Sequence, residues 1–331
     1  MRVGYVVQRA SDRGPTIVAV SARRGFLPLL RPFVKGALTF VPGANAILPK
    51  PNAGNRPPST YFYGVWLKHL SFLLDQGFPM PDCVAELGPG DSLGLGICAL
   101  LCGARRYVGL DIYSHTAARE NIQALHELAE LFRTCAPRPK KGWPDFDALL
   151  DDRLFLKGVK PAVTDELVHS IERALLHEKA DGLTCAYKLP WHRPDTIEPS
   201  SVDIAISHAV LEHVKDIRET YAALHSWLKP GGVMSHQIDF RSHNLTPDWN
   251  GYRAISEGVW RVMMGRRPYL INREPWSAHA SAITEAGFKI INFQLLLRQD
   301  GIARSACAPR WRDLSEEDLL CAEAFVQAKK T

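Results

Sequence analysis

Two groups of residues in this sequence have types and spacings that suit chemistry. The first is a glycine-rich turn, Glu86-Leu-Gly88-Pro-Gly90-Asp-Ser92, which follows an apolar run typical of a buried strand. Glycine lacks a Cβ, so the chain can turn sharply there while a ligand approaches its backbone. The first N–H groups of a following helix then favour an anionic group. The turn therefore indicates a nucleotide-like ligand with an anionic end.

A carboxylate stands where such a ligand would need one. Asp111 ends the next predicted strand, about 20 residues after Gly90, where an acid accepts hydrogen bonds from ribose hydroxyls in nucleotide-binding folds. The alternative is that Asp111 only caps the following helix. Strand, spacing and turn agree with one another, so we predict ribose binding.

The second group contains side chains that can move protons, near the ends of two later predicted strands. Its members are His208, His213, His236, Asp239 and His243. His236 and Asp239 are three residues apart in a strand and point to opposite faces, and Asp239 is nearer the open end. We predict Asp239 first as a base or an acceptor-orienting group, with His208 and His236 as further candidates. For His213, support of the loop under the ligand is the favoured alternative to catalysis.

A metal is a second reading of the same residues. The spacing His236-x-x-Asp239-x-x-x-His243 could provide ligands for a divalent cation. Strand geometry spreads these side chains, however, so we expect no metal. The seven cysteines show no metal-ligand spacing. Four of them lie in apolar runs and are predicted to be reduced core residues of a cytoplasmic protein: Cys83, Cys98, Cys102 and Cys185.

The elements that must position both groups alternate along the chain. Apolar patterns predict strands over 83–87, 106–111, 183–187, 202–207, 233–240 and 288–297, with helices over 61–74 and in most of the intervals between them, and a possible last strand over 319–326. Strands that alternate with helices imply a parallel sheet covered on both faces, which is a three-layer α/β sandwich.

The chain divides into an N-terminal arm with a linker over 1–58 and a main domain over 59–331. Residues 42–58 are rich in Pro, Gly and Asn, and the stretch 133–182 is long enough for a helical lid inserted over the acceptor. Residues 23–35 are basic and apolar, which suits weak contact with a membrane surface or packing on the main domain. Pro28 and Pro32 are expected to interrupt a continuous helix, which favours packing.

Composition is that of an ordinary globular protein. Of 331 residues, 46% are hydrophobic and 23% charged, and the net charge of +5 is not concentrated in a basic run. We therefore expect a small-molecule partner and no nucleic acid. No apolar stretch reaches the ~18 residues that a transmembrane helix requires.

A third pattern completes a resemblance. The stretch Asp203–Val214 ends in Leu-Glu-His-Val and is followed by Leu228-Lys-Pro-Gly-Gly232. Together with the turn and Asp111, it resembles the class I S-adenosylmethionine-dependent methyltransferases, in particular the group with quinone-biosynthesis and sugar methyltransferases, over residues 80–300. The resemblance implies a Rossmann-like, seven-stranded, mostly parallel sheet with an antiparallel last strand, and S-adenosylmethionine as cofactor.

The resemblance also implies roles for individual residues. The turn would hold the methionine end, and the negative charge of Glu86 would face the cationic portion or orient the loop. Ser92 departs from a third glycine and could cap the helix. Tyr187 is predicted near the adenine, with a packed aromatic as the alternative. The cofactor residues predicted in this way are Glu86, Gly88, Pro89, Gly90, Asp91, Ser92, Asp111, Ile112, Tyr187, Ser207 and His208.

The expected activity is methylation of a small molecule, with O-methylation of a sugar or glycan precursor as the first hypothesis. Aromatic residues and arginines over 241–273 suit a polar ring, and they equally suit ordinary packing. A C-methyltransferase acting on a quinone-like or lipid acceptor is the alternative within the same family. A nucleotide-dependent oxidoreductase and a non-catalytic binding module are alternatives from other classes.

Overall fold

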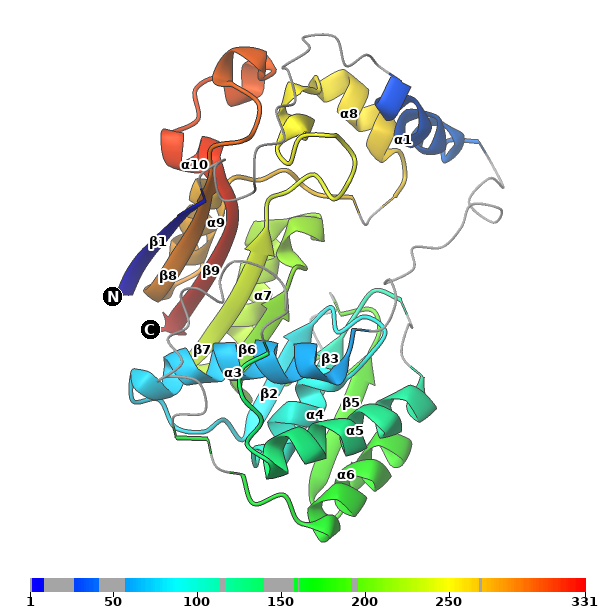
Figure 1. Ribbon diagram of the computed structural model, residues 1–331, viewed down its shortest axis with the longest axis vertical. Helices are drawn as coiled ribbons and strands as arrows, with labels where there is room; N and C mark the ends of the chain where they lie inside the picture. The colour runs from blue at the N-terminus through cyan, green and yellow to red at the C-terminus, as the bar shows by residue number, and fades with distance from the viewer. Residues whose placement is uncertain are drawn as a thin grey trace.

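The computed structural model describes residues 2–8, 27–41, 57–113, 117–139, 158–159, 161–191, 196–267 and 270–331 (Figure 1). The strands are β1 (Arg2–Gln8), β2 (Cys83–Leu87), β3 (Arg106–Leu110), β4 (Lys179–Ala180), β5 (Leu183–Lys188), β6 (Val202–His208), β7 (Leu228–Asp239), β8 (Phe288–Arg298) and β9 (Cys321–Lys330). The α-helices are α1 (Leu27–Leu38), α3 (Ser59–Asp75), α4 (Gly94–Leu101), α5 (Ala118–Arg133), α6 (Asp165–His177), α7 (Ile217–Trp227), α8 (Glu257–Met264), α9 (Trp276–Glu285) and α10 (Glu316–Leu320). Short 3-10 helices are η3 (Leu211–His213), η4 (Gly251–Ala254), η5 (Arg304–Ala306) and η6 (Pro309–Trp311).

The sheet has nine strands in the described chain, in the order β1-β8-β9-β7-β6-β2-β3-β5-β4. Its inner seven strands confirm the predicted sheet, because β2, β3, β5, β6 and β7 pair in parallel and β9 pairs antiparallel with both β7 and β8. Two edge strands extend it. β4 forms a short antiparallel hairpin with β5, and β1 pairs in parallel with β8. The first residues of the predicted arm are therefore part of the main sheet.

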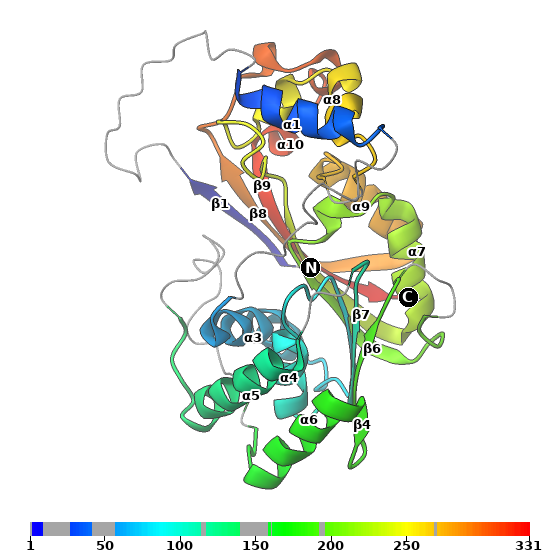
Figure 2. The same cartoon turned by 90° about the vertical axis from the view of Figure 1, so that its right-hand side faces the viewer.

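Helices cover both faces of the sheet (Figure 2). One face packs against α3, α4, α5 and α6, and the other against α7 and α9. Close approach on the first face depends on small residues: a Cβ at Gly94 would lie 2.3 Å from the Phe62 ring, and one at Gly96 would lie 2.4 Å from the Tyr107 ring. α6 belongs to this layer and contacts α5. This part of the predicted lid over 133–182 therefore covers the sheet, while 140–157 lies outside the described residues.

A small helical cap, defined here as α1, η4, α8 and the segments joining them to β7 and α9, has its own core of Tyr252, Ile255, Trp260, Met263 and Ile271. Figure 1 shows α1 and α8 at one end of the molecule, far from α4, α5 and α6. The prediction that prolines interrupt the helix over 27–38 is wrong, because α1 continues through Pro32. Residues 9–26 and 42–56 of the predicted arm lie outside the described chain.

The aromatic residues and arginines of 241–273 are used for packing in this cap. The Arg273 guanidinium lies 4.3 Å from the centre of the Trp260 ring, and Arg253 lies 5.6 Å from that of Tyr252. Their stacking supports the packing alternative for this stretch. No helix among the described residues is long and apolar enough to cross a membrane.

Candidate functional site

The glycine-rich turn between β2 and α4 is held from two sides. Gly88 and Gly90 have φ angles of +64° and +66°, which side chains rarely adopt. The Gly88 N–H donates to the Leu110 carbonyl at 2.7 Å, and a Cβ at Gly88 would lie 2.7 Å from Val210. The turn is thus fitted between the end of β3 and the segment that follows β6.

Asp111 lies directly against this turn. Its Oδ2 accepts from the Gly90 N–H at 3.2 Å, and its Oδ1 accepts from the Ile112 N–H at 2.7 Å. The two elements predicted to hold opposite ends of one nucleoside are therefore adjacent. Next to this buried carboxylate, Ile112 and Tyr113 each keep 38% of their surface exposed. A carboxylate beside exposed apolar side chains fits a ribose with an attached base.

Tyr187 stands at the same edge. Its hydroxyl donates to the Tyr113 carbonyl at 2.8 Å, so it supports the segment that follows Asp111. Trp191, further along, packs edge-on against Trp227 at 6.3 Å between ring centres. Tyr187 and Trp191 are both partly buried against the core, and the place of Tyr187 beside the adenine stays a prediction.

Glu86 is a buried residue of β2, and its role toward the ligand or the loop stays a prediction. It is 4% exposed, and its Oε2 accepts from the Tyr107 hydroxyl at 2.6 Å. Burial raises its pKa from 4.5 to about 8, although the Tyr107 hydrogen bond acts in the opposite direction. In this state a large fraction of Glu86 carries a proton at neutral pH, so its charge is not permanently present.

Two serines predicted at the cofactor have other partners. Ser92 is 1% exposed, and its hydroxyl lies 3.4 Å from the Asn121 side chain, which also caps the Leu93 N–H at 3.0 Å. The side chain that caps α4 is therefore Asn121 rather than Ser92. Ser207 points to the face covered by α7 and α9, where its hydroxyl bonds His236 Nδ1 at 2.8 Å.

His236 shares that location, which argues against a catalytic role. Its side chain is fully buried, near Tyr221 and His279, and faces away from Asp239 as the strand alternation predicts. Burial lowers its pKa to about 3. The alternative reading of His236 and Asp239 as ligands of one metal does not fit this arrangement, because their side chains lie on opposite faces of β7.

His208 lies on the other face of the sheet, against α3. Its ring contacts Tyr61 and His69 edge-on, at 5.7 and 6.1 Å between ring centres. Burial, with the positive charge of Lys68, lowers its pKa well below 6.5, so the ring is neutral. Tyr61 was not predicted as a site residue, although its ring stands at the start of a helix just before β2. Burial, and next the charges of Glu86 and Glu212, raise the pKa of its hydroxyl.

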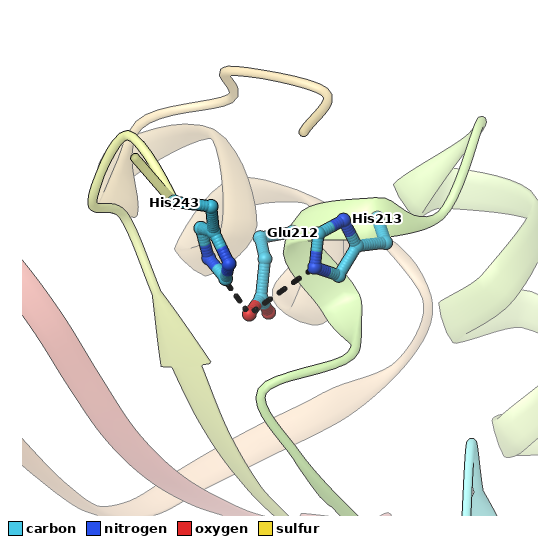
Figure 3. A group of neighbouring side chains, drawn as sticks. All are labelled: Glu212, His213 and His243. Carbon is cyan, nitrogen blue, oxygen red and sulfur yellow. Dashed lines mark ion pairs between the residues drawn. The ribbon is translucent and has the colours of Figure 1, made fainter. Parts of the chain in front are cut away.

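The second part is a charged cluster at the ends of β6 and β7 (Figure 3). His243 Nε2 lies 3.6 Å from Glu212 Oε1 and 3.5 Å from Asp239 Oδ2, and His213 Nε2 lies 4.0 Å from Glu212 Oε1. The structure thus brings together Asp239, His213 and His243 from the predicted set. It adds Glu212, which the Leu-Glu-His-Val pattern contained as an unassigned acid.

Asp239 is engaged by an arginine. Arg241 donates from Nε and Nη2 to the two Asp239 oxygens at 2.9 and 2.8 Å, and its Nη2 lies 3.1 Å from Glu323. This bidentate contact engages both carboxylate oxygens and fixes the Asp239 side chain next to His243. The role of Asp239 as a base stays a prediction.

Glu212 has no such partner. It is 2% exposed, and neither carboxylate oxygen accepts a hydrogen bond of normal geometry from the described residues. Burial, and next the charge of Asp239, raise its pKa above 4.5, although nearby backbone N–H groups favour the ionised form. Burying a carboxyl group without a hydrogen bond costs free energy of folding. The two Glu212 oxygens therefore stay available to bind a ligand or an ion.

The backbone that carries Glu212 is held firmly. Asn272 donates from Nδ2 to the carbonyls of Leu211 and Val214 at 2.8 and 3.1 Å, and its N–H donates to the Glu212 carbonyl at 2.6 Å. Opposite Glu212, His243 has a φ of +49°, a backbone conformation that is uncommon for residues other than glycine. The fold thus accepts strain at His243 while it fixes the turn opposite.

Comparison with known proteins identifies the fold. Residues 61–292 match the family described as "Methyltransferase domain". The chain belongs to this family. It is an S-adenosylmethionine-dependent methyltransferase of class I, as its strand order also indicates. This result favours methyl transfer over the alternatives of an oxidoreductase or a non-catalytic module.

Individual relatives are distant. Over 104 residues the chain is 30% identical to the ubiquinone biosynthesis O-methyltransferase of Methylocella silvestris, a match that covers 30% of this chain and 41% of that protein. An S-adenosylmethionine-dependent methyltransferase from Mesorhizobium loti is 15% identical, with 80% of this chain and 100% of that chain covered and a TM-score of 0.39. A putative sarcosine dimethylglycine methyltransferase from Galdieria sulphuraria is 14% identical, with 81% and 85% covered and a TM-score of 0.44.

S-adenosylmethionine supplies an electrophilic methyl group on a sulfonium when it is bound. The residues that would hold it are the turn with Gly88 and Gly90, together with Asp111. Ile112 and Tyr187 would flank the base. Tyr61 and His208 would lie beyond them, toward the charged cluster that an acceptor would meet.

Proposed function

We propose that this methyltransferase acts on a hydroxyl oxygen of a small molecule, bound against the cluster of Glu212, Asp239, His213 and His243. The observation that carries the proposal is the cluster itself. It joins two imidazoles to two carboxylates at the carboxyl ends of β6 and β7, where acceptors bind in open α/β sheets. A hydroxyl must lose its proton as the new O–C bond forms and the S–C bond breaks, and these groups can favour that loss.

Access to the cluster supports this role. The side chains of His213 and His243 are 31% and 28% exposed, whereas those of Glu212 and Asp239 are each 3% exposed. An acceptor can therefore reach the imidazoles while the carboxylates stay behind them. Buried carboxylates in this position orient imidazoles and stabilise positive charge on them.

Sugars and glycan precursors are the first acceptor class that we propose. Phenols related to quinone precursors are the second, because the Methylocella relative carries an O-methyltransferase name from ubiquinone biosynthesis. Both classes present hydroxyl groups, so the proposal that an oxygen atom is methylated holds for either class. C-methylation of a quinone-like ring is the competing reaction, in which a C–C bond forms as the S–C bond breaks and a proton leaves the ring carbon rather than a hydroxyl.

The test is transfer from methyl-labelled S-adenosylmethionine to panels of sugars, glycan precursors and phenols, with the ¹³C shift of the new methyl group distinguishing oxygen from carbon. We expect an O-methyl product. His243→Gln should lower kcat by about 10²- to 10⁴-fold, the usual contribution of a group that assists proton transfer. The control is His126→Gln on the exposed side of α5, which should leave kcat unchanged. A C-methyl product, or full activity of His243→Gln, would contradict the proposal.

A further inference from the structure

The cluster at the ends of β6 and β7 has features that proton transfer alone does not explain. Glu212 is buried, yet neither of its oxygens accepts a normal hydrogen bond from the described residues. The nearest imidazole nitrogens stand at 3.6 and 4.0 Å, which is too long for hydrogen bonds. A side chain evolved only to orient His243 would be expected to bond it directly.

We propose that Glu212, His213 and His243 form a binding site for a divalent cation of the zinc type, an inference that rests on the proposed function for its role but not for its geometry. One ligand atom from each residue lies within 4.8 Å of the others. Two ligands at about 2.0–2.2 Å from one cation, at a tetrahedral angle, lie about 3.4 Å apart. Separations of 3.6 and 4.0 Å are therefore close to those that a shared cation requires.

The direction of the side chains agrees with this reading. Figure 3 shows the two imidazoles on either side of the Glu212 carboxylate, each with its Nε2 toward the carboxylate. The cluster is held in this arrangement by the backbone, through the Asn272 contacts to the turn and the left-handed conformation at His243. Ligands fixed before binding lose little entropy when the cation arrives.

Charge also points to a cation. Arg241 already compensates Asp239 and contacts Glu323, whereas no described arginine or lysine forms an ion pair with Glu212. A divalent ion would give the buried carboxylate a counter-charge and a bonding partner at once. Asp239 Oδ2 lies 3.5 Å from the same nitrogen, His243 Nε2, so its negative charge would also face the cation.

The ligand set selects the cation. Two imidazoles and one carboxylate suit Zn²⁺, Co²⁺ or Fe²⁺ and leave positions open for oxygens of another molecule, whereas Mg²⁺ and Ca²⁺ prefer oxygen ligands throughout. The partly exposed imidazoles leave a route for the ion and for an acceptor. A cation here would draw a hydroxyl of the acceptor to the strand ends and ease the loss of its proton to water.

The experiment is titration of the chelator-treated full-length chain with Co²⁺, followed by visible absorption, and with Zn²⁺, followed by calorimetry. We expect one ion per chain and a ligand-field spectrum for Co²⁺. Glu212→Gln keeps the shape of the side chain but removes its charge, and His243→Gln removes a ligand; each should weaken binding by about 10-fold or more. His126→Gln is the control with an unchanged affinity, and binding of S-adenosylhomocysteine reports that each variant is folded.

Three outcomes are informative. Absence of Co²⁺ and Zn²⁺ binding, or equal affinity in wild type, Glu212→Gln and His243→Gln, overturns the cation site. If hydroxyl compounds are then still methylated in the presence of chelator, the proposed function stands and His243 itself takes the proton. If the ion binds as expected but no hydroxyl compound is methylated, the cation site stands and the proposed function fails. Should Glu212→Gln not fold, His243→Gln gives the same test.

Discussion

The two ends of this site are built in different ways. At the cofactor end, the contacts between the turn and Asp111 involve backbone N–H groups and come from short, continuous segments. At the acceptor end, the groups are side chains from η3, from the end of β7 and from the segment that follows it. Asn272, in the cap segment that leads to α9, holds the turn that carries Glu212. A backbone-built site tolerates few changes at its glycines, whereas a site built from side chains depends on the segments that hold them.

The largest effect is expected from Gly88→Ala. The added Cβ would lie 2.7 Å from Val210, in a backbone conformation at φ +64° that costs a side-chain residue about 1–2 kcal/mol. We expect the affinity for S-adenosylhomocysteine to fall by about 100-fold, measured by calorimetry. The matched control is Gly77→Ala, with φ +81° and no atom within 4 Å of the new Cβ. It should lower the free energy of unfolding and leave the affinity unchanged.

The proposed difference between the two ends of the site would be contradicted if Gly88→Ala bound S-adenosylhomocysteine with the affinity of the wild type. The turn would then not approach the ligand. The hydrogen bond from the Gly90 N–H to Asp111 would only stabilise the fold. A sharper version measures Co²⁺ binding by the same variant. The added Cβ would press on Val210, the residue before η3, so unchanged Co²⁺ binding would show that η3 is held independently of the turn.

Asn272→Ala should produce the reverse pattern, with a smaller effect. The substitution removes two hydrogen bonds to the carbonyls of Leu211 and Val214, each worth about 1 kcal/mol, and frees the turn that carries Glu212. Misplacement of such groups by about 1 Å can cost up to 100-fold in rate. We expect kcat to fall by about 10- to 100-fold with an unchanged affinity for S-adenosylhomocysteine.

The control for this variant is Asn292→Ala. Asn292 is a fully buried amide, whereas Asn272 is partly buried, and Asn292 bonds Gln327 within the sheet at 3.2 Å, far along the chain from η3. It should reduce stability and leave kcat of the remaining folded enzyme unchanged. Equal loss of kcat in both variants would mean that the role of Asn272 is general stability rather than placement of Glu212.

The sequence predicted the cofactor end better because its signals are local. The strands, the turn over 86–92 and Asp111 are set by apolar runs, glycines and spacing, all of which can be read along a short stretch. Ser92 and Ser207 were assigned by position in a pattern, but their side-chain directions depend on Asn121 from α5 and on the face of β6 that each residue takes. Position in a motif does not determine which partner a buried hydroxyl finds.

The acceptor end was harder to predict because its residues meet only in three dimensions. Asp239 and His243 were chosen correctly as members of one cluster, but no local signal showed that Arg241 would hold Asp239 or that Glu212 would face His243. The same limit affected the cap. Pro32 argues against a helix locally, yet α1 packs on α8, and tertiary contacts outweigh the local penalty.

The smallest effect, and the one that connects the two ends, concerns Glu86. Its pKa is raised from 4.5 to about 8 in the folded chain, so the buried carboxyl contributes stability below pH 4.5 that is lost as the pH rises through about 8. The cationic sulfonium and ammonium of the cofactor would favour the ionised form and lower this pKa. Binding then releases a proton, and affinity for S-adenosylmethionine should rise with pH, by up to tenfold per unit, until about pH 8.

Calorimetry in two buffers of different ionisation enthalpy measures that proton. Glu86→Gln should bind with no pH dependence in this range, and S-adenosylhomocysteine, which lacks the sulfonium charge, should show a weaker dependence than S-adenosylmethionine. An equal slope for both ligands in the wild type would mean that Glu86 senses only the ammonium end, and a flat profile would mean that it supports Tyr107 and never meets the ligand's charge.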